Sequence, residues 1–182
     1  MSSIPVDVLN AVTQCNEKVT AVEKEIEEFT NQVRIDFRSK IEPLFDKRHL
    51  ELEKIEGFWG SAFVAVESPL MGLLNGTIDP KIVRALTDFR VKTSVRDGSI
   101  CRCVSVTFRP NMFVKEGTFS RELDPSVNTL SLQPILWKPG TEKARTDSLF
   151  RFFSPECKDI EFLERALTEF DELFQNPLLA FE

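Results

Sequence analysis

The first 56 residues of the chain contain no glycine, and their apolar side chains recur at alternating steps of three and four residues. Such steps keep side chains on one narrow stripe of an α-helix, against which a second helix can pack. From Leu9 to Leu44 the stripe extends about 54 Å at about 1.5 Å per residue. A domain of this size cannot bury so long a stripe, so the sequence predicts a homodimer that pairs through it.

The predicted dimer interface consists of the stripe positions Val12, Cys15, Val19, Val22, Ile26, Phe29, Val33, Phe37, Ile41 and Leu44. Beyond Val33 the spacing changes, a stutter that locally unwinds a supercoil without ending the helix. Pro43 removes one backbone hydrogen bond, so we expect a kink there with continuation on both sides. We expect Gly57 to end the helix. The predicted division is therefore a dimerisation helix over residues 1–56 and a domain over residues 57–182.

The second part has the pattern of an α+β domain with a mainly antiparallel sheet and a C-terminal acidic helix. Short helices are expected at 58–66, 69–74 and 79–86, the last with Asp79 as its cap. Strands are expected at 90–95, 100–108, 113–123 and 130–137, followed by a mobile polar loop at 139–148, a buried aromatic segment at 149–153 and an amphipathic helix at 159–174. Asp97-Gly98 predicts a hairpin between the first two strands, and Pro134 places the last strand at an edge.

The net charge of −6 is unevenly distributed along the chain. Residues 1–56 carry 8 basic and 12 acidic side chains, residues 57–150 carry 12 and 9, and residues 151–182 carry 3 and 8. Acidic ends favour a basic partner, because complementary charge attracts it without any change of fold.

The acidic partner surface is predicted on the outer face of the last helix, opposite its apolar positions Ile160, Leu163, Leu167, Phe170 and Phe174. The candidate residues are Asp159, Glu161, Glu164, Glu169, Asp171 and Glu172, with Glu122 and Asp124 as weaker candidates at the rim of the sheet. A charged outer face is also what any solvated helix shows, so the pattern alone leaves both interpretations open.

No catalytic, cofactor or metal motif is recognisable. Cys101 and Cys103 share one strand face, but a zinc site needs two more ligands and His49 is the only histidine. His49 has charged neighbours, and we expect it to be exposed to solvent. The sequence has no phosphate-binding glycine loop or nucleophile elbow, so we expect neither an enzyme nor a bound cofactor. No apolar run is long enough to span a membrane, and no signal peptide is expected.

Several motifs, taken in order, resemble the nucleosome assembly protein family. That family carries an aromatic residue, five further residues, and then Pro-(Leu/Phe)-aromatic-x-Lys-Arg late in its long helix. This chain matches the pattern with Phe37, Pro43, Leu44, Phe45, Lys47 and Arg48. The following segment, Ile55 to Trp59 and then Phe63-Val64, is similar to the SET branch.

Further matches cover the rest of the chain to about residue 180. They are Leu73-Leu74, Leu86-Thr87, Phe108 with Asn111 and Phe113 (one residue shorter than in the family), Ile135 with Trp137-Lys138 and Gly140, Ser148 to Phe153, and Asn176-Pro177-Leu178. The family usually has a long acidic tail, whereas this chain stops at Glu182, which leaves truncation and a tailless protein as alternatives. The loop with Lys143 and Arg145 lacks a basic run that could serve as a nuclear address.

The resemblance implies a homodimeric histone chaperone whose α/β "earmuff" domains bind core histones of either kind of pair, and which works in the nucleus and shuttles to the cytoplasm. Two alternatives stay open. The first is an adaptor that regulates a chromatin-modifying enzyme or a phosphatase. The second and weaker one is direct contact with duplex DNA through the basic middle segment: Lys81, Arg84, Arg90, Lys92, Arg96, Arg102 and Arg109. Because apolar residues separate these cations, we expect weak DNA binding or none.

Overall fold

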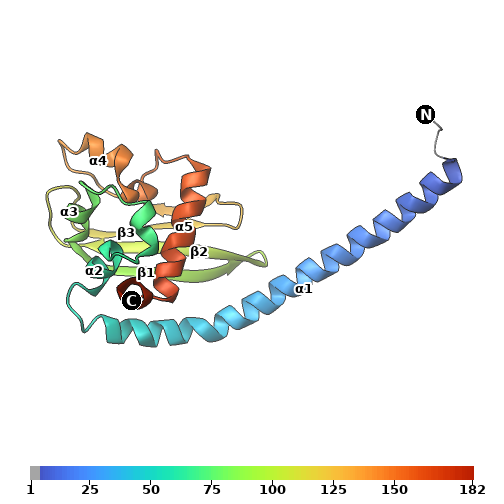
Figure 1. Cartoon of the computed structure of the whole chain (residues 1–182), viewed down its shortest axis with the longest axis horizontal. Coiled ribbons are helices and arrows are strands. Elements are labelled where there is room, and N and C mark those ends of the chain that lie inside the picture. Colours follow the sequence, from blue (N-terminus) through green and yellow to red (C-terminus); the bar gives the residue numbers. More distant parts are fainter. Residues whose placement is uncertain (1–4) are drawn as a thin grey trace. The chain divides into compact units, whose positions relative to one another are not determined.

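The computed structural model describes residues 5–182 and divides the chain into two compact units, one ending at Lys40 and one from Ile41 to Glu182 (Figure 1). The helix α1, Val6–Leu52, has 47 residues and continues through Pro43, as predicted. None of the helices in the described range is both long enough and apolar enough to cross a membrane.

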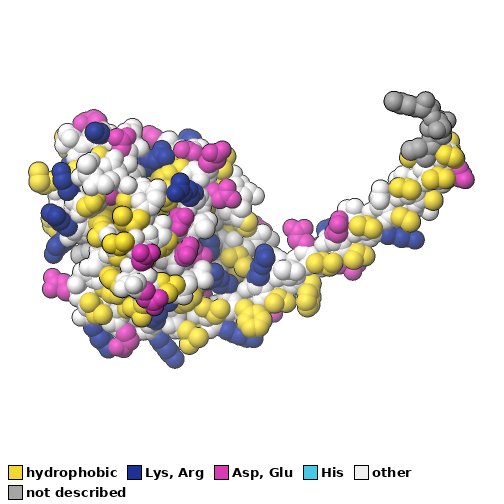
Figure 2. Space-filling model, in the orientation of Figure 1, with side chains coloured by type: hydrophobic (Ala, Val, Ile, Leu, Met, Phe, Trp, Pro, Cys, Tyr) yellow, Lys and Arg dark blue, Asp and Glu magenta, His cyan; other side chains and the backbone are white. Residues whose placement is uncertain are grey.

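In the described range, the only helix or strand of the first unit is the part of α1 up to Lys40. Its stripe side chains are exposed, with Val12 at 50%, Ile26 at 60% and Phe29 at 73% of their full accessible surface. Figure 2 shows hydrophobic side chains along this part of the helix. Among residues 5–40 these side chains therefore have nothing to pack against.

The second unit begins with the last turns of α1. This helix ends at Leu52, four residues before the predicted end at residue 56, because the amides of Lys54 and Ile55 bond three residues back rather than four. Gly57, at φ +71°, lies in the turn that follows. The next elements are the helix α2 (Phe58–Val64), the 3-10 helix η1 (Pro69–Gly72) and the helix α3 (Asp79–Val83).

The sequence predicts that Asp79 caps α3, but the structure does not show this cap. Asp79 is fully buried inside the first turn, where its Oδ2 accepts hydrogen bonds from the amides of Asn75 and Leu149, and its Oδ1 accepts one from the Ser148 hydroxyl. Burial raises the pKa of the Asp79 carboxyl, and these hydrogen bonds oppose the rise. The carboxylate thus ties α3 to a segment about 70 residues later in the chain.

The sheet is antiparallel, with strand order β1-β2-β3-β4. The strands are β1 (Leu86–Arg96), β2 (Ser99–Phe108), β3 (Gly117–Leu123) and β4 (Thr129–Gln133). Asp97 and Gly98 both have positive φ and form the predicted hairpin turn. The third and fourth strands are shorter than predicted; β4 is an edge strand that stops before Pro134, which has no amide hydrogen to donate.

The segment from Glu142 to Asp147 forms the helix α4, where a loop was predicted. It is followed by the 3-10 helix η2 (Leu149–Phe153), the helix α5 (Ile160–Gln175) and the 3-10 helix η3 (Leu179–Phe181). Figure 1 shows α5 crossing one face of the sheet, where it contacts β1 and β2.

Phenylalanine rings pack against one another in the core between α5 and the sheet. Phe89 lies edge-on to Phe63 and to Trp59, with ring centroids 5.0 and 5.1 Å apart. Phe170 of α5 lies edge-on to Phe152 at 5.2 Å. Such pairs contribute about 1 kcal/mol each beyond the apolar area they bury, so the core holds α5 firmly in place.

Candidate functional site

The outer face of α5 is the candidate site, and the sequence of the helix sets its geometry. The Asp159 carboxylate accepts a hydrogen bond from the Phe162 amide at 3.1 Å and so caps the first turn. Leu163 and Phe170 are buried against the domain, whereas Ile160, predicted on the same face, is exposed. Because one face is fixed by packing, the remaining helix positions must point outward.

We call Glu161, Glu164, Glu169 and Glu172 the α5 acidic row. Glu161, Glu164 and Glu172 are exposed, and Glu169 is half-buried. None of the four forms a hydrogen bond or ion pair through its side chain with another residue in the range 5–182. Figure 2 shows acidic side chains on the face of the domain that α5 occupies. The row therefore presents four carboxylates that lack an ion-pair partner among residues 5–182, and Arg165 is the one basic residue on the same helix.

The other two predicted carboxylates of α5 have cationic partners. Asp159 lies 3.3 Å from the Arg151 guanidinium. Asp171 is paired with Arg102, whose guanidinium also lies 3.6 Å from Glu42 Oε1 near the end of α1. Arg102, Asp171 and Glu172 line a hollow of about 360 Å³ beside the row.

Glu122 and Asp124 lie on β3 and the turn after it, away from the row. Glu122 is buried, and its carboxylate accepts hydrogen bonds from Ser94 at 2.6 Å, Arg96 at 2.6 Å and Ser131 at 3.1 Å. The Ser94 hydrogen bond is the main reason that the pKa of Glu122 is lowered. Hydrogen bonds from Asn128 lower the pKa of Asp124 and use both of its carboxylate oxygens. Both carboxylates are already engaged within the chain.

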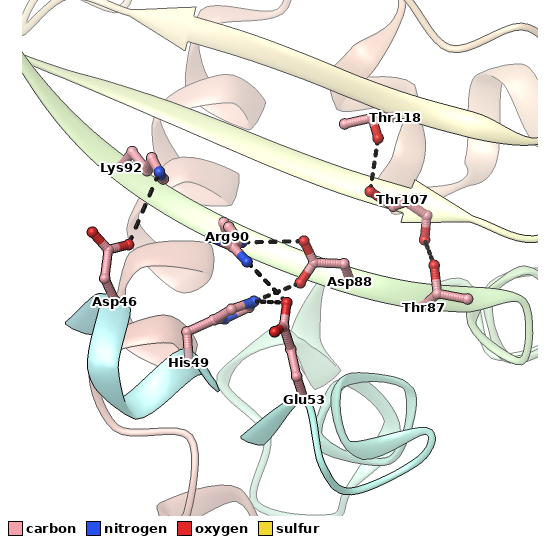
Figure 3. A network of polar contacts seen from close by, with 9 residues as sticks. All are labelled: Asp46, His49, Glu53, Thr87, Asp88, Arg90, Lys92, Thr107 and Thr118. Atoms are coloured by element: carbon pink, nitrogen blue, oxygen red, sulfur yellow. Dashed lines mark hydrogen bonds and ion pairs between the residues drawn. The ribbon is translucent and has the colours of Figure 1, made fainter. Parts of the chain in front are cut away.

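A polar network joins the last turn of α1 to the sheet (Figure 3). Only 2% of the His49 surface is exposed, which corrects the prediction of a solvated histidine. Its Nε2 lies 2.8 Å from Asp88 Oδ1 and 3.2 Å from Glu53 Oε1, and its ring stacks on Trp59. Burial acts to raise the pKa of Asp88, but the contacts with His49 and Arg90 outweigh it and lower that pKa.

The same network is the one group in the described range that brings a histidine and two carboxylates together. Its three potential ligand atoms lie within 4.8 Å of one another. The Arg90 guanidinium, however, lies 2.9 Å from Glu53 Oε1 and 3.2 Å from Asp88 Oδ2. Arg90 already supplies the positive charge that a metal ion would bring, so the group forms an ion-pair network that fastens α1 to β1.

Two arginines fix the surroundings of the site: Arg48, which belongs to the motif late in α1, and Arg121, which no sequence motif singles out. Arg48 donates to the backbone carbonyls of Phe174 and Gln175, the last of α5, at 2.7 Å to Gln175. A cation suits this end of a helix, where the carbonyls are unsatisfied. Arg121 is buried, and it donates to the carbonyl of Phe152 in η2 and to those of Ser154 and Cys157 in the segment before α5. Its burial lowers the pKa of the Arg121 guanidinium.

The basic middle segment does not form one surface. Arg90, Arg96 and Arg102 pair with carboxylates of the same chain, and Lys92 lies 3.9 Å from Asp46. Three cations of the predicted set, Lys81, Arg84 and Arg109, have no carboxylate partner in the part of the chain that the structure describes, and they lie together at one hollow.

Sequence comparison finds distant relatives. No family model matches the chain. The chain is 26% identical over 137 residues to NAP1-related protein 2 and to NAP1-related protein 1, both of Arabidopsis thaliana. The match covers 74% of this chain and 50% of each relative, so it spans about half the length of the curated relatives.

Solved structures share the fold over nearly the whole chain. Ccp1 superposes with a TM-score of 0.71 at 20% identity, covering 93% of this chain and 95% of that one. Nucleosome assembly protein S from Plasmodium falciparum gives 0.65 at 17% identity, covering 96% and 99%. Nucleosome assembly protein 1 from Plasmodium knowlesi gives 0.64 at 16% identity, covering 99% and 96%. The sequence matches confirm the resemblance to nucleosome assembly proteins, the solved structures confirm the shared fold, and the SET branch stays a prediction.

Proposed function

From the premise that this chain has the fold of the nucleosome assembly proteins and resembles two NAP1-related proteins in sequence, we propose that it is a histone chaperone. It works as a homodimer in the nucleus, binds basic core histones and catalyses no reaction. The observation that carries the proposal is the α5 acidic row, four carboxylates that lack cationic partners among residues 5–182.

The row supports a mechanism of electrostatic competition. Carboxylates fixed on a rigid helix attract lysine and arginine side chains of a histone and cover charges that would otherwise meet DNA unproductively. Because α5 is held by a buried aromatic core, histone binding requires no rearrangement of the chaperone. Duplex DNA presents a denser array of negative charge, so it can take the histone over once the assembly geometry is correct.

The exposed stripe of α1 supports the homodimer. Large apolar side chains recur along it for most of the length of the helix, and among residues 5–40 they lack a packing partner. An isolated helix with such a stripe would leave this surface in water, whereas a second copy would bury it. The predicted interface positions Cys15 and Ile41 belong to the same stripe; Cys15 is exposed and Ile41 half-buried.

Charge reversal on α5 tests the histone-binding proposal. We expect Glu164→Lys with Glu172→Lys to weaken the binding of a core-histone pair at least tenfold at physiological salt, measured by fluorescence anisotropy. The matched control is Glu67→Lys with Glu116→Lys, two exposed carboxylates outside α5 that produce the same change in net charge. Equal losses in both variants would show that only net charge matters and would remove the row from the proposal.

A salt titration separates the chaperone from an adaptor of a chromatin-modifying enzyme. Charge-based histone binding should weaken steeply between 0.15 M and 1 M salt, where the Debye length falls from about 8 Å to about 3 Å. Histone binding that persists at high salt, or that is absent, would contradict the proposed mechanism.

A further inference from the structure

A second, oppositely charged surface lies where α3, the start of β1 and the loop after β2 meet. A hollow of about 580 Å³ opens there, and the cations Lys81, Arg84 and Arg109 line it together with the apolar side chains of Met112 and Phe113. No acidic residue is among those that line it. The chain as a whole has a net charge of −6, so this surface is locally positive on an acidic protein.

The cations at the hollow are not neutralised by the chain. Lys81 and Arg84 are exposed, and neither side chain forms an ion pair or hydrogen bond among the described residues. The Arg109 guanidinium donates a hydrogen bond to the Arg84 carbonyl at 2.9 Å, which holds it at the rim. Other arginines of the sheet, such as Arg96 with Glu122, have carboxylates of their own.

The apolar side chains that line the hollow are partly exposed to solvent. Met112 exposes 85% of its surface, and Phe113 is half-buried beside it. The loop that carries them is fixed rather than loose, because the Asn111 carboxamide oxygen accepts the amides of Phe113 and Val114, and the Lys138 ammonium donates to the Asn111 carbonyl. An exposed methionine on a fixed loop is suited to contact with an apolar side chain of variable shape.

We propose that this hollow binds an acidic peptide segment that carries an apolar residue, supplied by a partner protein. The guanidiniums of Arg84 and Arg109 would each take a carboxylate, since the planar fork of arginine matches its geometry. The apolar side chain of the peptide would enter between Met112 and Phe113. An acidic peptide would be attracted to this hollow and not to α5, because the α5 acidic row would repel it.

The arrangement favours an acidic peptide over duplex DNA. A duplex requires cations spread along its backbone, and the other basic residues of the middle segment are already paired within the chain. Three cations around an apolar depression instead match a short segment that combines carboxylates with one buried side chain.

Fluorescence anisotropy with a labelled twelve-residue peptide of Glu and Asp with a central Leu-Phe tests the proposal on the full chain at physiological salt. We expect saturable binding that Lys81→Glu with Arg84→Glu weakens at least tenfold, and Lys81→Gln with Arg84→Gln weakens several-fold. The control, Lys143→Glu with Arg145→Glu, reverses two exposed cations of α4 and should change binding less than twofold. Replacing Leu-Phe in the peptide with Ser-Ser should also weaken binding.

Three results would overturn the proposal. They are the absence of peptide binding to the wild-type chain, equal losses in the hollow and control variants, and tighter binding of a 20-base-pair duplex with the same dependence on Lys81 and Arg84. Because both residues are exposed, the variants should keep the thermal midpoint of the wild type, which each preparation must show. Loss of peptide binding with histone binding retained separates this surface from the α5 acidic row.

Discussion

His49 Nε2 lies 2.8 Å from Asp88 Oδ1, a contact that joins the last turn of α1 to β1. The imidazole is almost completely buried between this carboxylate, Glu53 and the ring of Trp59. The end of the proposed dimerisation helix is therefore part of the folded domain, and the connection is both polar and aromatic.

Replacing His49 with Ala should destabilise the domain by about 2–4 kcal/mol. The substitution removes a buried ring and leaves Asp88 without its histidine partner. Urea unfolding followed by tryptophan fluorescence measures the change, since Trp59, one of the two tryptophans, stacks on the replaced ring. Asp46→Asn is the control, because its contact with Lys92 is exposed and 3.9 Å long, and it should change the stability by less than about 1 kcal/mol. Equal effects of the two substitutions would contradict this role of His49.

Acid should destabilise the domain partly through Glu122. Hydrogen bonds from Ser94 and Ser131 and the charge of Arg96 lower the pKa of this carboxyl. A lowered folded-state pKa contributes stability above the unfolded-state pKa, and that stability is lost as the pH falls through the folded value. We expect the thermal midpoint of the wild type to drop as the pH falls below about 4, and that of Glu122→Gln to drop less steeply. Parallel curves would refute this assignment.

A charge in the stripe of α1 should break the proposed dimer. Val22→Asp places a carboxylate where the second helix would pack, and a buried unpaired charge costs several kcal/mol. Sedimentation velocity should then show a species of half the mass. Thr20→Asp adds the same charge outside the stripe and should leave the dimer intact. If both variants sediment like the wild type, the interface assignment is wrong.

Arg121→Lys should destabilise the domain by about 2–3 kcal/mol despite keeping the charge. Arg121 donates to the carbonyls of Phe152, Ser154 and Cys157, and a single ammonium cannot reach three acceptors spread in this way. Thermal unfolding measures the effect. The control is Lys143→Arg, an exchange of cations at an exposed position, which should leave the thermal stability unchanged. If Arg121→Lys also leaves it unchanged, the three hydrogen bonds contribute little.

Local chemistry decided which elements the sequence could predict. The Asp97-Gly98 turn, the edge position before Pro134 and the amphipathic face of α5 depend on neighbouring residues. The structure agrees with all three, except that Ile160 at the start of α5 is exposed. His49 and Asp79 were misplaced because their partners are 39 and about 70 residues away, and no local pattern reveals such pairs.

For the candidate site, the helical spacing predicts which carboxylates of α5 point outward. It does not predict that Arg102 pairs with Asp171 or that Arg151 pairs with Asp159, because the two arginines come from β2 and η2. Only the three-dimensional arrangement shows that Asp159 and Asp171 are paired with arginines while the α5 acidic row is not. The hollow at Lys81 and Arg84 likewise depends on the loop after β2 returning to α3.

The most direct test of the central claim is the mass of the protein in solution, measured by light scattering alone and with each of the two kinds of core-histone pair at physiological salt. We predict a mass near twice 20.8 kDa that rises when histones are added and returns to the dimer value at high salt. A monomer would contradict the interface on α1, and a dimer whose mass does not change with either histone pair would contradict the proposed function.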